Sequence, residues 1–157
     1  MIRKLEDNDV ADCIALMKKS YAQNDSYGVG YNARNEVAWI EFLIKHITGT
    51  VIGDPHFFTI CDVQDGEMKG FMIASTYLCP YTGRFVMDVK DCIVDKQNNN
   101  AIRVTRFFDK LMEHIEENGG LDWRADSVQA FDDSNKYAEF LCKRYRGTKY
   151  VSVRGQV

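Results

Sequence analysis

Apolar residues recur at every third or fourth position in four stretches of the chain. This spacing places them on one face of an α-helix. It predicts helices over residues 10–22, 34–47, 101–117 and 135–145. The third stretch has a regular apolar stripe formed by Val104, Phe108, Leu111, Met112 and Ile115. Gly119 and Gly120 follow it, as is typical of a helix C-terminus.

Between these stretches lie shorter runs rich in β-branched and aromatic residues, which favour strands. They predict strands over residues 2–5, 57–63, 68–77, 84–94, 126–131 and 149–153. Asp65-Gly66 is a hairpin signal between the second and third runs. We therefore expect an antiparallel meander of three strands. Gly49, Gly53 and Pro55 predict a break between residues 48 and 55.

Composition sets limits on what this chain does. Its 157 residues are 45% hydrophobic, which suits one domain spanning residues 1–157. A net charge of -3 disfavours a general nucleic-acid binder or a protein attracted to anionic membranes. A bilayer-spanning helix needs an apolar stretch of roughly 20 residues. No stretch of the sequence approaches that length.

Cysteine and histidine spacing gives no sign of a metal site. The five cysteines are widely spaced, without a CxxC pair, and the three histidines form no HxxxH or HExxH pair. We expect reduced thiols packed as small apolar residues, as in a cytoplasmic protein. No metal ligand set is predicted.

Three segments resemble the GNAT family of acyl-CoA N-acyltransferases over nearly the whole chain. They are IRKLEDNDVADCIALM, then FFTICDVQDGEMKGFMIAS, then RFVMDVKDCIVDKQNNNAIRVTRFFDKLMEHIEENG followed by SNKYAEFLCKRYRGTKY. The resemblance implies an α/β (α+β) fold with a mixed, mostly antiparallel central sheet flanked by helices. It also implies acetyl-CoA as co-substrate and an amine of a small molecule or protein as acceptor. A homodimer or a protein partner stays open.

The family's cofactor turn usually reads Arg/Gln-x-x-Gly-x-Gly/Ala before a helix, whose N-terminus binds the pyrophosphate. In this chain neither possible register restores a glycine: Asn100 and Ile102 stand at the glycine positions. Asn100 tolerates a left-handed conformation, whereas β-branched Ile102 departs further. The resemblance places the cofactor on Cys92, Ile93, Val94, Asn98, Asn99, Asn100, Ala101, Ile102, Arg103 and Asn135, with Arg106 adding charge.

That turn also has a plain structural interpretation. The Asn run is equally a loop with a helix N-cap, Asn135 a cap of its own helix, and the Arg residues a solvated face. The two interpretations stay open at this point.

Acetylation of an amine needs a base for the ammonium and a hydrogen-bond donor for the developing oxyanion. In the family this donor is commonly a backbone N–H of the fourth strand, here in Cys92–Val94. Candidate bases are Asp88 and Asp91, which point to opposite faces if the strand is regular. The family's acid is often a Tyr of the last helix, for which Tyr145 is the candidate. Exposed carboxylates and a packed tyrosine are the alternatives.

Aromatic residues of the first two helices and the loop between them lie where relatives shape the acceptor site. Tyr27, Tyr31 and Trp39 are therefore candidate substrate contacts. Core packing explains Trp39 equally well, whereas the loop residues are less easily explained by packing.

Two functions are compatible with these observations. The first is an N-acetyltransferase that uses acetyl-CoA. The second is a protein that keeps the fold without the cofactor and serves a binding or structural role, as some small viral proteins do.

Overall fold

The protein is described by a computed structural model over residues 1–23, 36–95, 100–125 and 134–148. One sheet contains five strands in the order β1-β2-β3-β4-β5. Neighbouring strands are antiparallel except for β4 and β5, which are parallel. The predicted mixed, mostly antiparallel sheet is thus confirmed. The strands are β1 (Ile2–Lys4), β2 (Phe57–Gln64), β3 (Glu67–Leu78), β4 (Phe85–Val94) and β5 (Asp122–Ala125).

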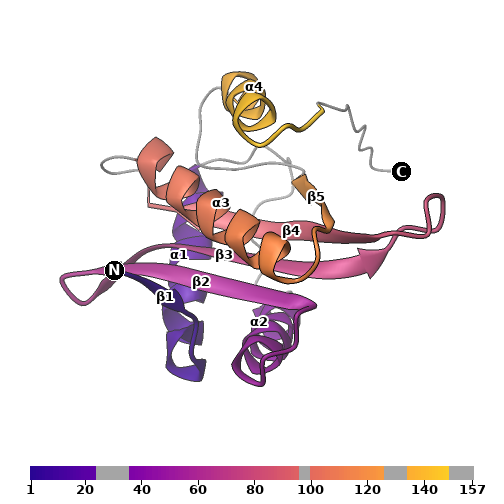
Figure 1. Cartoon of the computed structure of the whole chain (residues 1–157). Coiled ribbons are helices and arrows are strands. Elements are labelled where there is room, and N and C mark those ends of the chain that lie inside the picture. Colours follow the sequence, from indigo (N-terminus) through magenta and orange to yellow (C-terminus); the bar gives the residue numbers. More distant parts are fainter. Residues whose placement is uncertain (24–35, 96–99, 126–133, 149–157) are drawn as a thin grey trace, which may run out of the picture.

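Helices cover both faces of this sheet (Figure 1). They are α1 (Val10–Gln23), preceded by the short 3-10 turn η1 (Asp7–Asp9), α2 (Glu36–Val51), α3 (Asn100–Glu117) and α4 (Ser134–Arg144). Helices α1 and α2 lie on one face, where Leu43 and Ile47 pack against Phe71 and Ile73. Helix α3 lies on the opposite face, and its predicted stripe packs against Met72 and Met87. None of the described helices is long and apolar enough to cross a membrane.

The predicted hairpin between β2 and β3 is confirmed. Its central residues, Asp65 and Gly66, have φ angles of 53° and 77°. Both are therefore left-handed, as a tight hairpin turn requires. This turn sets the register of the meander in which β3 is paired on both sides.

The predicted break at residues 48–55 is wrong in its first part, because α2 continues to Val51. Gly49 lies inside the helix where the sheet comes close. A Cβ added there would lie 2.3 Å from Cδ2 of Phe57. Thr50 supports the same turn, since its hydroxyl donates to the His46 carbonyl at 2.9 Å. Gly49 thus permits a close approach of helix and sheet, although its sequence signal is that of a break.

The fifth described strand begins earlier than predicted. It comprises Asp122–Ala125, whereas the predicted strand over 126–131 lies outside the described residues, as does that over 149–153. Trp123 explains the position, because its ring packs edge-on against Phe108 of α3 and Tyr145 after α4. The strand has four residues and one large apolar side chain, so it is too short to show a periodic pattern in the sequence.

Candidate active site at the edge of β4

A bulge in β4 overturns the expectation that Asp88 and Asp91 point to opposite faces. Ile73 pairs with Asp91 while Ala74 pairs with Val89, so Lys90 has no partner on β3. The extra residue shifts the alternation by one position. Ser75 pairs with Asp88, and directly opposed residues share a face. Because Ile73 packs with α1 and α2, and Ser75 contacts α2, both aspartates lie on that face.

Two polar residues that sequence analysis did not select lie on the same face. His46 of α2 is buried, with Nδ1 2.7 Å from the Phe42 carbonyl oxygen and Nε2 3.2 Å from Ser75 Oγ. Its ring contacts Phe42 and Phe57, at centroid distances of 4.1 and 5.2 Å. Burial lowers the pKa of His46. The hydrogen bond to the Phe42 carbonyl raises this pKa but does not outweigh the burial. No motif links residues 29 positions apart, so only the β3–α2 contact reveals the pair.

The two aspartates have different surroundings. Asp88 is partly exposed and accepts a hydrogen bond from Lys90 Nζ at 2.6 Å. Lys90 Nζ also lies 5.8 Å from the centroid of the Tyr77 ring. Asp91 is 8% exposed. Burial raises the pKa of Asp91 to about 7, opposed by a hydrogen bond from the Cys92 backbone N–H. Asp88 is therefore the carboxylate that a ligand on this face reaches more easily.

The second half of β4 has a free outer edge in the part of the chain that is described. Strand β5 pairs with β4 only along Val86–Val89, so Lys90–Val94 has no described strand on that side. The side chains of Cys92, Ile93 and Val94 are buried, which leaves their backbone groups as the atoms that a ligand could use. Use of these residues by a cofactor, through the main chain, stays a prediction.

Helix α3 starts shortly after this edge, at Asn100. The first N–H groups of an α-helix have no partner within the helix, so those of Asn100, Ala101 and Ile102 are the groups of α3 that could donate to an anion. Asn100 Oδ1 is buried without a hydrogen-bond partner among the described residues. Because amide oxygen and nitrogen are assigned by inference, the flipped amide would offer N–H donors. Exposed Arg106 lies further along the helix, and the Ile102 side chain is 52% exposed. These residues fit a bound pyrophosphate.

Arg103, predicted to add charge against the phosphates, forms a buried ion pair with the sheet. Its Nε donates to Asp62 Oδ2 of β2 at 2.7 Å, and both side chains are buried. Burial alone would raise the pKa of Asp62, but hydrogen bonds from Arg103 and the Met1 ammonium outweigh it and lower that pKa. The ion pair of Arg103 with Asp62 thus links α3 to β2, with each buried charge compensated by the other.

Tyr145 packs against α3, as in the alternative interpretation of this residue. Its hydroxyl donates to Asp109 Oδ1 at 2.6 Å, and its ring stacks on Phe108 at 5.9 Å. Burial and the neighbouring Asp109 carboxylate raise the pKa of Tyr145 to about 12. These contacts join the end of α4 to α3.

The other predicted site residues are distributed as follows. Trp39 is half-buried on α2 and meets Phe42 edge-on at 5.3 Å, so it borders the face that carries Asp88. Asn135 lies in the first turn of α4. Tyr27, Tyr31, Asn98 and Asn99 lie outside the described residues. No group of three or more His, Cys, Asp or Glu in the described segments could hold a metal ion.

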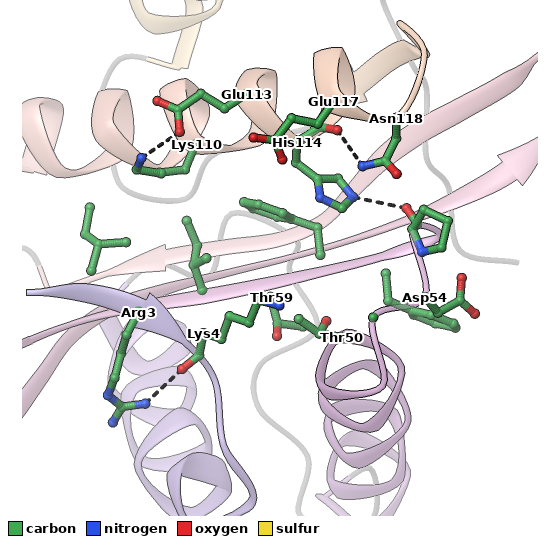
Figure 2. A pocket seen from close by; sticks show the side chains of 16 residues that line it. Arg3, Lys4, Thr50, Asp54, Thr59, Lys110, Glu113, His114, Glu117 and Asn118 are labelled. Carbon is green, nitrogen blue, oxygen red and sulfur yellow. Dashed lines mark hydrogen bonds and ion pairs between the residues drawn. The ribbon is translucent and has the colours of Figure 1, made fainter.

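A concavity lies at the β1 edge of the sheet, away from β4 (Figure 2). It has a volume of about 370 Å³ and lies between β1, β2 and the last turns of α3. Its wall includes His114, whose Nε2 lies 3.0 Å from the Pro55 carbonyl oxygen, and the Lys110–Glu113 ion pair. Since β1 and β4 are separated by two strands, this groove is distinct from the β4 edge.

Comparison with solved structures gives full-length matches, although no family model and no curated protein matches the chain. A predicted acetyltransferase from Clostridium acetobutylicum with acetyl-CoA has a TM-score of 0.69 at 12% identity, covering 98% of this chain and 95% of that one. Glucosamine-6-phosphate N-acetyltransferase from Arabidopsis thaliana has a TM-score of 0.67 at 13% identity, covering 99% and 97%. The chain has the GNAT acetyltransferase fold.

A third GNAT structure comes from a complex with coenzyme A. It is the PaiA N-acetyltransferase of Thermoplasma acidophilum, with a TM-score of 0.66 at 17% identity, covering 99% of this chain and 92% of that one. At these identities the similarity establishes the GNAT fold alone, because one fold supports many functions. Function must therefore be argued from the β4 edge and the residues around it.

Proposed function

We propose that this protein transfers the acetyl group of acetyl-CoA to an amine of a small molecule or protein. One observation carries the proposal: along Lys90–Val94 no strand among the described residues pairs with the outer edge of β4, and this edge runs toward the start of α3, beside two carboxylates on one face. An extended arm fits an unpaired strand edge, and a pyrophosphate fits a helix start. The GNAT fold of the chain supports this placement.

The cofactor would be held mainly by main-chain groups. Backbone atoms of Cys92–Val94 would hold the pantetheine arm, and the first turn of α3 with Arg106 would hold the phosphates. Bound acetyl-CoA supplies an activated acyl thioester. A β4 backbone N–H would stabilise negative charge on the acyl oxygen, and a donor fixed in a buried strand needs no reorganisation to do so.

Asp88 is the proposed proton acceptor for the attacking amine. It is partly exposed on the α2 face, and general bases must reach the proton that they remove. In the structure this carboxylate pairs with Lys90 Nζ, an ammonium that the attacking amine would displace. Buried Asp91, with a pKa of about 7, would adjust the charge of this face instead of touching the amine.

Thermal unfolding with acetyl-CoA, and separately with CoA, tests the proposal. Binding to the native state must raise the melting temperature, since stabilisation grows with RT ln(1 + [L]/Kd). An acetyl-transfer assay over an amine panel follows. We expect Asp88→Asn to lower kcat by at least about 100-fold. Asp12→Asn, an exposed carboxylate of α1, is the control. Absence of any shift at millimolar cofactor would refute the proposal.

The alternative function is a binding or structural role without cofactor. Two observations favour it: Arg103 Nε donates to buried Asp62, and the Tyr145 hydroxyl donates to Asp109. Co-purification with a stoichiometric partner, without CoA in the preparation and without a thermal shift, is the result expected of this alternative.

A further inference from the structure

The Ser75–His46 pair on the α2 face has a defined direction of hydrogen bonding. His46 Nδ1 lies 2.7 Å from the Phe42 carbonyl oxygen. A carbonyl oxygen only accepts, so Nδ1 carries the proton and donates. In the neutral imidazole Nε2 is then the acceptor. Burial keeps the ring neutral by lowering the pKa of His46. The Ser75 hydroxyl, 3.2 Å from Nε2, therefore donates into the ring.

Because the Ser75 hydroxyl donates its proton to His46, its oxygen can only accept hydrogen bonds from a ligand. Ser75 is partly exposed and lies directly opposite Asp88. Direct opposition places the two Cβ atoms about 5 Å apart. Both side-chain oxygens therefore act as hydrogen-bond acceptors on one patch of the α2 face. Such a patch fits a ligand with several N–H donors and disfavours an anion.

We infer that His46 is a positioning residue that fixes Ser75 Oγ as an acceptor, so that Ser75 and Asp88 together bind the ammonium group of a primary-amine acceptor. The inference rests on the proposed function and specifies how its acceptor is bound: as a primary ammonium held by Ser75 and Asp88. Lys90 occupies the Asp88 carboxylate in the structure and exposes about a third of its side chain. The acceptor ammonium replaces Lys90 Nζ on that carboxylate.

The same geometry gives the site a dependence on pH. Protonation of His46 turns Nε2 into a donor, which reverses the Ser75 hydroxyl and points its proton at the ligand. Charged groups of the same region are Lys45 on α2 and Lys90, Asp88 and Asp91 on β4. Burial, and to a smaller extent the two lysines, disfavour the imidazolium, so the change occurs below the ordinary pKa of histidine.

The test measures binding of butylammonium chloride to the CoA-saturated protein by NMR, with ¹⁵N-labelled histidine. At pH 8 we expect the His46 signals of an Nδ1–H tautomer, with Nε2 perturbed by butylammonium. Ser75→Ala and His46→Leu should each weaken butylammonium binding about tenfold, and the double variant no more than either. Ser75→Thr, which keeps the hydroxyl, should restore most of the affinity.

Lowering the pH to 5 should weaken binding in the wild-type protein. Asp91, with a pKa of about 7, also titrates in this range, so the comparison is made in the Asp91→Asn background. There, replacement His46→Gln, which keeps an acceptor but does not titrate, should abolish the pH dependence. The matched control is His56→Gln: His56 Nδ1 lies 2.5 Å from Thr76 Oγ1, an equivalent pair on the opposite face. It should leave butylammonium binding unchanged.

An Nε2–H tautomer at pH 8, or equal affinities of the wild type and Ser75→Ala, would overturn the inference. Acetyl transfer to butylamine is recorded in parallel. Binding that depends on Ser75 without any acetyl transfer would reject the proposed function while keeping the ammonium site. Acetyl transfer that does not depend on Ser75 or His46 would reject the ammonium site while keeping the proposed function.

Discussion

Burial changes the chemistry of Asp91 at the scale of a single residue. The carboxyl lies on the bulged part of β4 and its pKa rises from 3.8 to about 7 because the charged form is desolvated. Between these two pH values the folded state binds more protons than the unfolded state. Linkage then makes this contribution to the free energy of unfolding fall as pH rises from about 4 to 7.

We therefore predict that Asp91→Asn flattens the pH dependence of stability. The variant should match the wild type near pH 4 and exceed it at pH 8 by up to about 4 kcal/mol, at about 1.36 kcal/mol per pKa unit. Urea unfolding from pH 4 to 8 measures this. Asp12→Asn serves as the exposed control. Parallel curves for Asp91→Asn and the wild type would show that Asp91 ionises normally in the folded protein.

Asp62 and Arg103 form a buried ion pair whose parts depend on each other. Removing one partner leaves an uncompensated buried charge, which costs about 3–5 kcal/mol. We predict this cost for Asp62→Asn, a smaller cost for Arg103→Leu because the Met1 ammonium still pairs with Asp62, and a partial recovery in Asp62→Leu/Arg103→Leu. The exposed pair Lys110–Glu113 is the control. There, Glu113→Gln should change the free energy of unfolding by less than about 0.5 kcal/mol. Additive costs in the double variant would contradict the pairing.

At the scale of elements, Gly49 is where α2 meets β2. In a helix interior Gly→Ala ordinarily stabilises by about 1 kcal/mol. We predict the opposite sign for Gly49→Ala, because the new Cβ overlaps the Phe57 ring. Thermal unfolding should show a loss that Phe57→Leu partly relieves in the double variant. Ala38→Gly, at an exposed position of α2, should cost only the propensity difference.

Tyr145 connects α4 to α3 through a phenol that bonds to a charged acceptor. We predict that Tyr145→Phe lowers the free energy of unfolding by about 1–2 kcal/mol, the usual cost of losing such a bond. It should leave kcat for acetyl transfer within twofold, whereas loss of a general acid costs about 100-fold or more. Tyr81→Phe, at a fully exposed position, controls for loss of a hydroxyl. A 100-fold fall in kcat would return Tyr145 to the catalytic role that the resemblance implies.

At the scale of the whole molecule, the proposed cofactor site at the edge of β4 and the groove of Figure 2 beside β1 are separated by two strands of one sheet. Hydrogen exchange with and without acetyl-CoA distinguishes them. We predict slower exchange at Cys92–Val94 and in the first turn of α3, with no change in β1 or at His114. S-acetylpantetheine, which lacks the nucleotide, should slow exchange at the β4 edge alone. Protection confined to the groove of Figure 2 would move the cofactor site away from β4.

Local patterns were enough to predict much of the architecture. Apolar spacing predicted the stripe of α3 from Val104 to Ile115, and Asp65-Gly66 predicted the hairpin. Such features depend on residues close in sequence, whose periodicity is set by backbone geometry. The mixed, mostly antiparallel sheet followed from the order of these elements and from the family resemblance.

The arrangement of the candidate site required tertiary information. Asp88 and Asp91 lie on the same face because Lys90 has no partner on β3. Arg103 forms an ion pair with Asp62, which lies 41 residues away in the sequence. His46 and Ser75 meet only because α2 packs on β3. The sequence by itself determined the elements and where most of them begin. Tertiary packing decided which polar groups meet, because burial and register are properties of neighbours brought together by the fold.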